Sequence, residues 1–324
     1  MAQRDQNPFP FSDTNKRYHT YSYYLKRTYG EKCVKLPIDA GMTCPNVDGR
    51  CGRGGCIYCS DRGSGDFAAN SARTVTEQIA QQRALLSGKW DPSHAIAYFQ
   101  ARTNTYAPPG RLRKLFEEAL AEDGIVGLNI ATRADCLEDE TVEYLAALAE
   151  RTTLTVELGL QTCHDRTAGL INRGHDFATF CHGFEKLRRA SERIRIGIHL
   201  ILGLPGESDT EMLESVKAVA RLHPDEVKLH LLHVLRGTRM AELFLEGEYM
   251  PLEKDHYTDL IVRALELLPP DVVIGRLTGD GKAEDLLAPL WSRDKRSVLN
   301  EIDQKMYGRN TYQGRLYSEA VRIP

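Results

Sequence analysis

Short apolar runs separated by helix-like segments constrain the fold of this 324-residue chain more than any other feature. Six runs have the length and composition of buried strands: 34–38, 95–99, 124–132, 153–160, 194–204 and 226–235. Helical patterns lie between them, at roughly 73–88, 110–122, 138–150, 176–191 and 209–222. Because strands that alternate with helices form βαβ units, this order predicts a parallel sheet. The nearly continuous apolar character of several runs indicates that both faces of the sheet are covered.

Six such units favour a partial (β/α)6 barrel that resembles a TIM barrel, and an open doubly wound sheet is the structural alternative. From about residue 240 the pattern changes to a helix followed by one further strand, which predicts a small C-terminal α/β extension. We therefore divide the chain into an N-terminal basic and aromatic arm (1–32), the partial barrel (33–238) and an extension that packs on the barrel (239–324).

Composition narrows the functional classes. No apolar run is long enough to span a membrane, and the first residues, MAQRDQNPFPFSD, contain no apolar signal segment, so we expect a cytoplasmic protein. In a reducing cytosol, clustered cysteines indicate metal ligands or catalytic groups rather than disulfides. The net charge of −3 argues against bulk nucleic-acid binding but is compatible with local basic patches.

Half of the eight cysteines lie in one stretch, CPNVDGRCGRGGCIYCS, which follows the first predicted strand. The C-x-x-C pair Cys56 and Cys59 can face one metal centre, and the glycines allow the backbone to fold closely around it. Three kinds of site are open on spacing alone. They are a four-cysteine zinc site, an electron-transfer cluster with the C-x4-C-x2-C spacing of plant-type ferredoxins from Cys51 onward, and a cluster held by three cysteines with one open iron.

The place of this stretch favours the third kind of site, because catalytic groups of α/β barrels lie in loops at the carboxyl ends of strands. An aromatic residue, Tyr58, also stands between Cys56 and Cys59. With Cys44, this arrangement resembles the radical S-adenosylmethionine (SAM) superfamily. In closer detail, the pattern CPN-x-DG…GGC-x-(aromatic)-C is similar to the bacterial branch related to the elongator catalytic subunit. The resemblance continues through four segments and covers roughly 20–290: YFQARTNTYAP, ELGLQT, INRGH and HLILGLPGE.

The resemblance implies a specific chemistry. Cys44, Cys56 and Cys59 would hold three irons of a [4Fe-4S] cluster, and the fourth iron would bind SAM. One electron from an external donor such as flavodoxin or ferredoxin would cleave SAM to a 5′-deoxyadenosyl radical that abstracts hydrogen from the substrate. Cys51 occupies a variable position of the family pattern. Because a fourth thiolate would block the open iron, we expect that Cys51 is not a ligand.

Polar and glycine residues near the ends of the later strands are expected to contact SAM. Together with the aromatic of the cysteine stretch, the predicted cofactor residues are Tyr58, Gln100, Thr103, Glu157, Gln161, Arg173 and Gly203. A guanidinium suits a carboxylate, so Arg173 is assigned to the methionine end, with a structural ion pair as the alternative. A charge within a buried strand is costly unless it is paired, so the alternative for Glu157 is an internal salt bridge. Relatives usually carry Gly-Gly-Glu after the second strand, and this chain has Gln100 and Thr103 there instead.

The substrate is less constrained. The resemblance suggests a tRNA wobble uridine without acetyl transfer, because nothing after about residue 290 resembles an acetyl-CoA-binding domain. Aromatic residues among basic ones at 17–32 suit base stacking and phosphate contact. In the sixth strand, Lys228 and His230 alternate onto one face, which indicates either a substrate-facing wall or a hydrogen-bond network. The alternatives are a radical SAM enzyme acting on a small metabolite and a four-cysteine electron-transfer protein.

Overall fold

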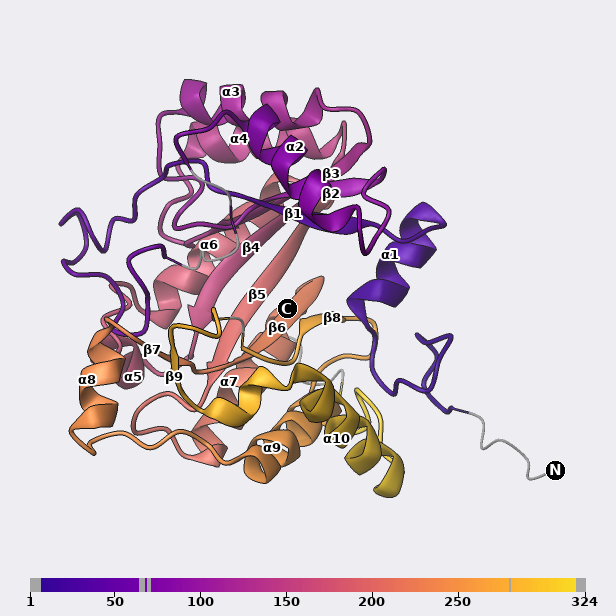
Figure 1. Ribbon diagram of the computed structural model, residues 1–324, viewed down its shortest axis with the longest axis vertical. Coiled ribbons are helices and arrows are strands. Elements are labelled where there is room, and N and C mark those ends of the chain that lie inside the picture. Colours follow the sequence, from indigo (N-terminus) through magenta and orange to yellow (C-terminus); the bar gives the residue numbers. More distant parts are fainter. Residues whose placement is uncertain (1–6, 64–67, 69–70, 280, 319–324) are drawn as a thin grey trace.

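Seven parallel strands form the centre of the molecule, in the order β1-β2-β3-β4-β5-β6-β8 (Figure 1). The computed structural model describes residues 7–63, 68, 71–279 and 281–318, so the first six residues of the predicted arm and residues 280 and 319–324 of the predicted extension lie outside the described residues. The strands are β1 (Val34–Ile38), β2 (Ala95–Phe99), β3 (Ile125–Thr132), β4 (Thr153–Gln161), β5 (Ile194–Leu202), β6 (Glu226–Leu231) and β8 (Val273–Arg276). Within the described part of the chain no pairing joins β1 to β8, and the sheet is a half-barrel with an open side.

The predicted partial barrel is confirmed, with one strand more than the six expected. The seventh strand, β8, comes from the segment that the sequence assigned to the extension, and its register with β6 runs from Val273 opposite Glu226 to Arg276 opposite Lys228. The run predicted at 226–235 divides into β6 and a short strand, β7 (Val234–Leu235), which pairs antiparallel with β9 (Leu286–Ala288). The division of the chain at residues 32 and 238 stays a prediction.

Helices connect the strands and cover the outer face of the half-barrel (Figure 1). The strand-connecting helices are α2 (Val75–Leu86), α3 (Pro109–Leu120), α4 (Asp139–Ala149), α6 (Phe177–Ala190), α7 (Asp209–Leu222) and α9 (Lys254–Leu267). Local sequence explains where they begin: Thr74 and Ser208 each form a capping box that starts α2 and α7. The other helices are α1 (Tyr21–Tyr29), α5 (Asp165–Leu170), α8 (Arg239–Leu245), α10 (Lys295–Gly308) and the 3-10 helix η1 (Leu290–Arg293).

Alternation along the strands separates an apolar outer face from a polar interior. In β4, Val156 and Leu158 are fully buried in the large core shared with the helices. Their neighbour Glu157 lines a cavity inside the half-barrel, as do His199 of β5 and Lys228 of β6. Successive side chains of a strand point to opposite faces, so one strand supplies both the core and the site. None of the helices in the described residues is long and apolar enough to cross a membrane.

The open side of the half-barrel lies between β1 and β8, and the N-terminal segment partly covers it. Thr20 forms an isolated parallel bridge with Ile274 of β8, and α1 begins at the next residue. Figure 1 shows α1 beside this opening. The segment preceding the barrel therefore borders the opening, and it does so through β8, a strand more than 240 residues later in the sequence.

Candidate active site

A cavity of about 330 Å³ lies inside the half-barrel, at the carboxyl ends of its strands and under the loop that follows β1. Nine of the ten residues that the sequence assigned to the site line it: Cys44, Cys56, Tyr58, Cys59, Gln100, Thr103, Glu157, Gln161 and Arg173. These residues come from four separate segments of the chain: the cysteine loop, the loop after β2, β4 and the INRGH turn. The structure thus brings together nearly the whole predicted site.

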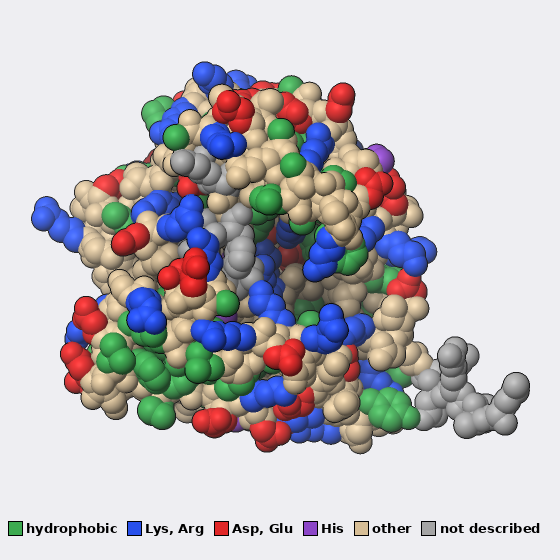
Figure 2. Space-filling model, viewed as in Figure 1, with side chains coloured by type: hydrophobic (Ala, Val, Ile, Leu, Met, Phe, Trp, Pro, Cys, Tyr) green, Lys and Arg blue, Asp and Glu red, His purple; other side chains and the backbone are tan. Residues whose placement is uncertain are grey.

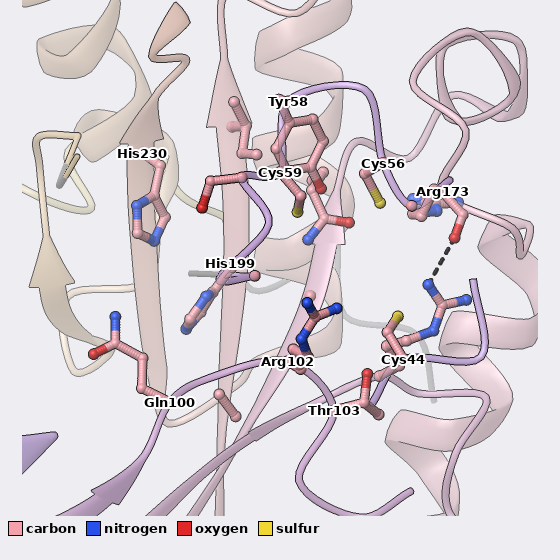
Figure 3. Close-up of a pocket in the computed structure, with 18 of the residues that line it drawn as sticks. Cys44, Cys56, Tyr58, Cys59, Gln100, Arg102, Thr103, Arg173, His199 and His230 are labelled. Atoms are coloured by element: carbon pink, nitrogen blue, oxygen red, sulfur yellow. Dashed lines mark hydrogen bonds between the residues drawn. The ribbon is translucent and has the colours of Figure 1, made fainter. Parts of the chain in front are cut away.

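Three of the clustered cysteines surround one hollow. Figure 3 shows the sulfur atoms of Cys44, Cys56 and Cys59 facing this space, with Tyr58 at its border. The hydrogen bond from the Cys59 thiol lowers the pKa of Cys56 to about 6, and the same bond raises the pKa of Cys59. A thiolate is the form that binds metal. Because each iron of a cluster takes its own thiolate, sulfurs arranged around a hollow suit a cluster.

The cysteine loop is held in place by a turn more than 100 residues later in the sequence. The Asn46 side chain is fully buried, and its amide donates to the Cys56 sulfur at 3.6 Å and to the Asn172 carbonyl. The Asn172 side chain donates to the Gly55 carbonyl at 2.7 Å, and the Ile57 amide donates to the carbonyl of Ile171 at 3.1 Å. The INRGH segment therefore acts as a clamp on the loop that carries the cysteines.

Cys51 lies outside this hollow. Its side chain is exposed, does not line the cavity, and donates to Asp135 Oδ2 at 3.6 Å. Asp135 is held by Arg133 through two hydrogen bonds of 2.9 and 2.8 Å, and Arg133 also donates to the Arg173 carbonyl at 2.7 Å (Figure 3). The expectation that Cys51 is not a ligand stays a prediction, which this geometry favours.

Arg173 is buried and keeps one donor unmatched. Its Nη1 donates to the carbonyls of Leu160 and Thr162, and its Nε donates to His175 O at 3.0 Å. Nη2 has no hydrogen-bond partner among the described residues, and Asp165 lies 3.9 Å away. A buried unsatisfied donor is costly, and a guanidinium suits a carboxylate. The side chain therefore fits the carboxylate-binding role predicted for it.

Glu157 forms the centre of a hydrogen-bond cluster inside the half-barrel. Its carboxylate accepts hydrogen bonds from Tyr98 Oη at 2.6 Å, Asn129 Nδ2 at 2.8 Å and Lys228 Nζ at 2.6 Å. It also contacts His199 Nε2 at 3.0 Å. The internal salt bridge, considered from the sequence as the alternative, is therefore present. A direct contact between Glu157 and a cofactor stays a prediction.

Burial controls the charges in this cluster. It would raise the pKa of Glu157, but Lys228 and Lys35 hold that pKa well below its usual range. Burial lowers the pKa of Lys228 to about 8 and that of His199 to about 4, and it lowers the pKa of His230 well below its usual value. Near neutral pH, the cavity wall thus carries a lysine ammonium beside neutral imidazoles. Lys228 and His230 line the cavity from the strand face onto which their alternation placed them, and His199 lines it from β5.

Gly203 is the one predicted residue that the structure does not bring to the cavity. Its φ of 87° lies in the left-handed region, which favours glycine. Its carbonyl accepts from Tyr249 Oη at 2.7 Å, and a Cβ at this position would lie 3.3 Å from Leu252. Gly203 therefore packs against Tyr249 and Leu252, which lie between α8 and α9, and it supports the site from outside the cavity.

Some residues of the site were not predicted. Arg133 and Arg276 line the cavity, and Lys35 faces Glu157 from β1 at 3.4 Å. Arg276 ends β8, so its place at the carboxyl end of a strand is a signal that could have identified it. The anchoring role of Asn46 had no such signal, because it depends on contacts with the distant INRGH turn.

The sequence matches the Radical SAM superfamily over residues 46–219 and the Radical_SAM C-terminal domain over residues 224–308. The chain is 47% identical to YtqA of Bacillus subtilis (strain 168) over 311 residues, which cover 96% of each protein. It is 36% identical to YhcC of Escherichia coli (strain K12) over 281 residues, 86% of this chain and 89% of that protein.

More distant relatives share the barrel. The tRNA uridine(34) acetyltransferase of Methanocaldococcus jannaschii is 30% identical over 189 residues, which cover 57% of this chain and 33% of that protein. Among solved structures, the archaeal Methanocaldococcus infernus Elp3 has a TM-score of 0.61 at 19% identity, over 87% of this chain and 64% of that one. Methylornithine synthase (PylB) has a TM-score of 0.52 at 15% identity, over 91% and 87% of the two chains, and these two likenesses concern the fold alone. By sequence, the chain belongs to the radical SAM superfamily.

Proposed function

We propose that this protein is a radical SAM enzyme whose [4Fe-4S] cluster is held by Cys44, Cys56 and Cys59. The observation that carries the proposal is the arrangement of three cysteine sulfurs around one hollow, which is continuous with the polar interior of the half-barrel. When bound there, the cluster supplies the electron that cleaves SAM to a 5′-deoxyadenosyl radical, which takes a hydrogen atom from the substrate. The electron comes from an external donor, for which flavodoxin or ferredoxin is suited.

The chain's own residues bind the cluster and SAM and fix their orientation. The Asn46 amide donates to the Cys56 sulfur, which stabilises the thiolate and fixes the loop. The unmatched Nη2 of Arg173 is available for the SAM carboxylate. Tyr58, Gln100 and Gln161 border the cavity and offer hydrogen-bonding groups, as does Thr103, which is nearly fully buried there. Gly203 supports the site from outside, through Tyr249.

We propose a tRNA wobble uridine as the substrate, in a cytoplasmic protein. Similarity to proteins named tRNA uridine(34) acetyltransferase supports this choice. Figure 2 also shows a hollow on the open side of the half-barrel that is bordered mainly by Lys and Arg side chains. Acetyl transfer is not part of the proposal, because the match covers 33% of that relative.

Anaerobic reconstitution tests the radical chemistry. We expect about four irons per chain, a change in the cluster's electron paramagnetic resonance spectrum when SAM is added, and release of 5′-deoxyadenosine when a reductant is present. An unchanged spectrum together with no 5′-deoxyadenosine would contradict the proposal and favour an electron-transfer protein that uses all four cysteines.

Nucleoside profiling tests the substrate. tRNA from cells with and without the gene is digested and compared by mass spectrometry, and we expect one uridine-derived nucleoside to disappear in the deletion strain. Its return on complementation with the wild-type gene, but not with a Cys56→Ala variant, would tie the modification to the cluster site. An identical profile in both strains would exclude tRNA and direct the search to small metabolites.

A further inference from the structure

A second hollow, of about 440 Å³, lies on the open side of the half-barrel. Residues of α1, β1 and β8 line it, and we call it the edge channel. It shares Tyr98, Gln100, Lys228 and Arg276 with the active-site cavity, so these four residues lie between the two hollows. The edge channel therefore lies beside the site, on the open side of the half-barrel between β1 and β8.

Positive charge dominates the edge channel. Its charged lining residues are Lys32, Lys35, Lys228, Arg276 and Lys295, and no Asp or Glu among the described residues lines it. Two carboxylates from the neighbouring interior reach these cations: Glu157 contacts Lys228 and Lys35, and Glu226 lies 3.8 Å from Lys35. Among the described residues that line the channel, every charged side chain is a cation, in a chain whose net charge is −3. Such a local excess selects an anionic ligand.

An exposed aromatic residue lies at the outer end of the channel. Lys32 Nζ is 2.6 Å from the centre of the Trp90 ring, Lys89 Nζ is 5.7 Å from it, and 41% of Trp90 is exposed. The nearest carboxylate in the sequence, Glu31, contacts His94 at 2.7 Å. A large exposed ring beside two lysines is an arrangement that stacks bases and contacts phosphates in proteins that bind single-stranded nucleic acid.

We propose that the edge channel binds the phosphates of a single-stranded polynucleotide, with a base stacked on Trp90 and a neighbouring nucleotide reaching the active-site cavity past Gln100 and Arg276. The five cations come from separate parts of the lining, which suits several phosphates in succession, whereas a small anion needs one converging cradle. The aromatic platform outside the channel serves no purpose for a small anion. The proposal deepens the proposed function by naming the path of the RNA. It rests on that function only for the reaction in the active-site cavity.

Binding of fluorescein-labelled oligouridylate and of tRNA to the full chain tests this path, measured by anisotropy between 50 and 300 mM salt. Each lost phosphate contact on a single strand lowers the salt slope by about 0.7. The double variant Lys32→Ala/Lys295→Ala should therefore lower the slope by about 1.4 and weaken binding about 25-fold at 0.1 M salt. Trp90→Ala should weaken binding at least about fivefold with little change in slope, because stacking carries no charge.

The matched control is Lys114→Ala/Lys217→Ala, which removes two exposed lysines from the outer helices α3 and α7. It should bind like the wild type, and thermal melting shows whether each variant is folded. The proposal is overturned if the channel variants bind RNA like the control. It is also overturned if uridine monophosphate binds as tightly as the oligomer with the same dependence on Lys32, because the ligand is then a small anion.

Failure of this path and failure of the proposed function give different results. Release of 5′-deoxyadenosine without substrate reports the cluster site, and it should persist in the Lys32→Ala/Lys295→Ala variant. RNA binding to the cluster-free protein reports the channel alone. If the protein binds RNA through the channel but does not cleave SAM, the result would support the RNA path and contradict the radical chemistry.

Discussion

At the scale of the residue, the position of each thiol around the hollow separates the four clustered cysteines. Cys51→Ser should keep its iron content and its 5′-deoxyadenosine release within about twofold of the wild type, because the Cys51 side chain contacts Asp135 outside the cavity. Cys44→Ser, Cys56→Ser and Cys59→Ser should each lose most of the cluster, since their thiolates are the proposed ligands. Iron analysis and the SAM cleavage assay measure both effects. Loss of the cluster in Cys51→Ser would restore the ferredoxin-type interpretation.

The cysteine loop also depends on one glycine, which has no functional side chain of its own. A Cβ on Gly52 would lie 2.0 Å from Oδ1 of the buried Asn46. Gly52→Ala must therefore displace the side chain that donates to Cys56, and overpacking of this kind typically costs about 1–3 kcal/mol. We expect lower iron retention on dilution in a protein that still folds. Gly88→Ala, where a Cβ meets nothing within 4 Å, is the control; equal iron retention in the two variants would contradict the role of Asn46.

At the scale of the element, the polar cluster between β4, β5 and β6 makes the fold sensitive to acid. His199 has a pKa lowered to about 4 by burial, against about 6.5 in the unfolded chain. Between these pH values the unfolded state binds the extra proton, so the free energy of unfolding falls as the pH drops from 6.5 to 4, by at most about 3 kcal/mol for this group. The lowered pKa values of His230 and, at lower pH, Glu157 act in the same direction.

Urea unfolding at pH 7 and pH 5 measures this dependence. His199→Gln should flatten the difference between the two pH values, because the amide does not titrate and can still reach Glu157. His182→Gln, at an exposed position on α6, should leave the difference as in the wild type. The same pH dependence in all three proteins would show that His199 is not the group responsible.

The elements themselves were largely predictable, because their signals are local. Strand runs and helix periodicity placed β1 to β6 and the helices between them close to their observed bounds. The addition of β8 to the sheet was not predictable, because β8 joins through pairing with β6, whose partner residues lie about 47 positions away. The same distinction applies within the site. Spacing identified Cys44, Cys56 and Cys59, while the clamp on Asn46 and the packing of Gly203 against Tyr249 arise from segments that only the fold brings together.

At the scale of the whole molecule, one buried glutamine joins the two ends of the chain. Gln313 Nε2 donates to the carbonyls of Pro269 and Val272 at 2.6 and 2.8 Å, and its Oε1 accepts from the His19 amide at 2.9 Å. The carbonyl of His19 in turn accepts from Ile274 of β8 at 2.7 Å. The C-terminal segment thus fixes the chain that leads into α1, the helix that borders the edge channel.

Gln313→Ala should therefore affect both stability and RNA binding. The change leaves the Val272 carbonyl and the His19 amide without the partner that Gln313 supplies, whereas the Pro269 carbonyl still accepts from the Val272 amide at 3.2 Å. At about 1–3 kcal/mol for each group the loss is at least about 2 kcal/mol. We expect the melting temperature to fall by about 3 °C or more, since an unfolding entropy of about 2.1 cal/mol/K per residue makes 1 kcal/mol worth about 1.5 °C in a chain of 324 residues. Arg315→Ala, at an exposed position of the same segment, should melt like the wild type.

RNA affinity shows whether the Gln313 contacts act only locally or also shape the edge channel. If the C-terminal segment positions α1, then Gln313→Ala should weaken oligouridylate binding well below its melting temperature, where the barrel is still folded. The salt slope should fall as well, because a displaced α1 no longer holds the loop with Lys32 beside the channel. A variant that melts early yet binds RNA with wild-type affinity and slope would show that β1 and β8 form the edge channel without help from the chain ends.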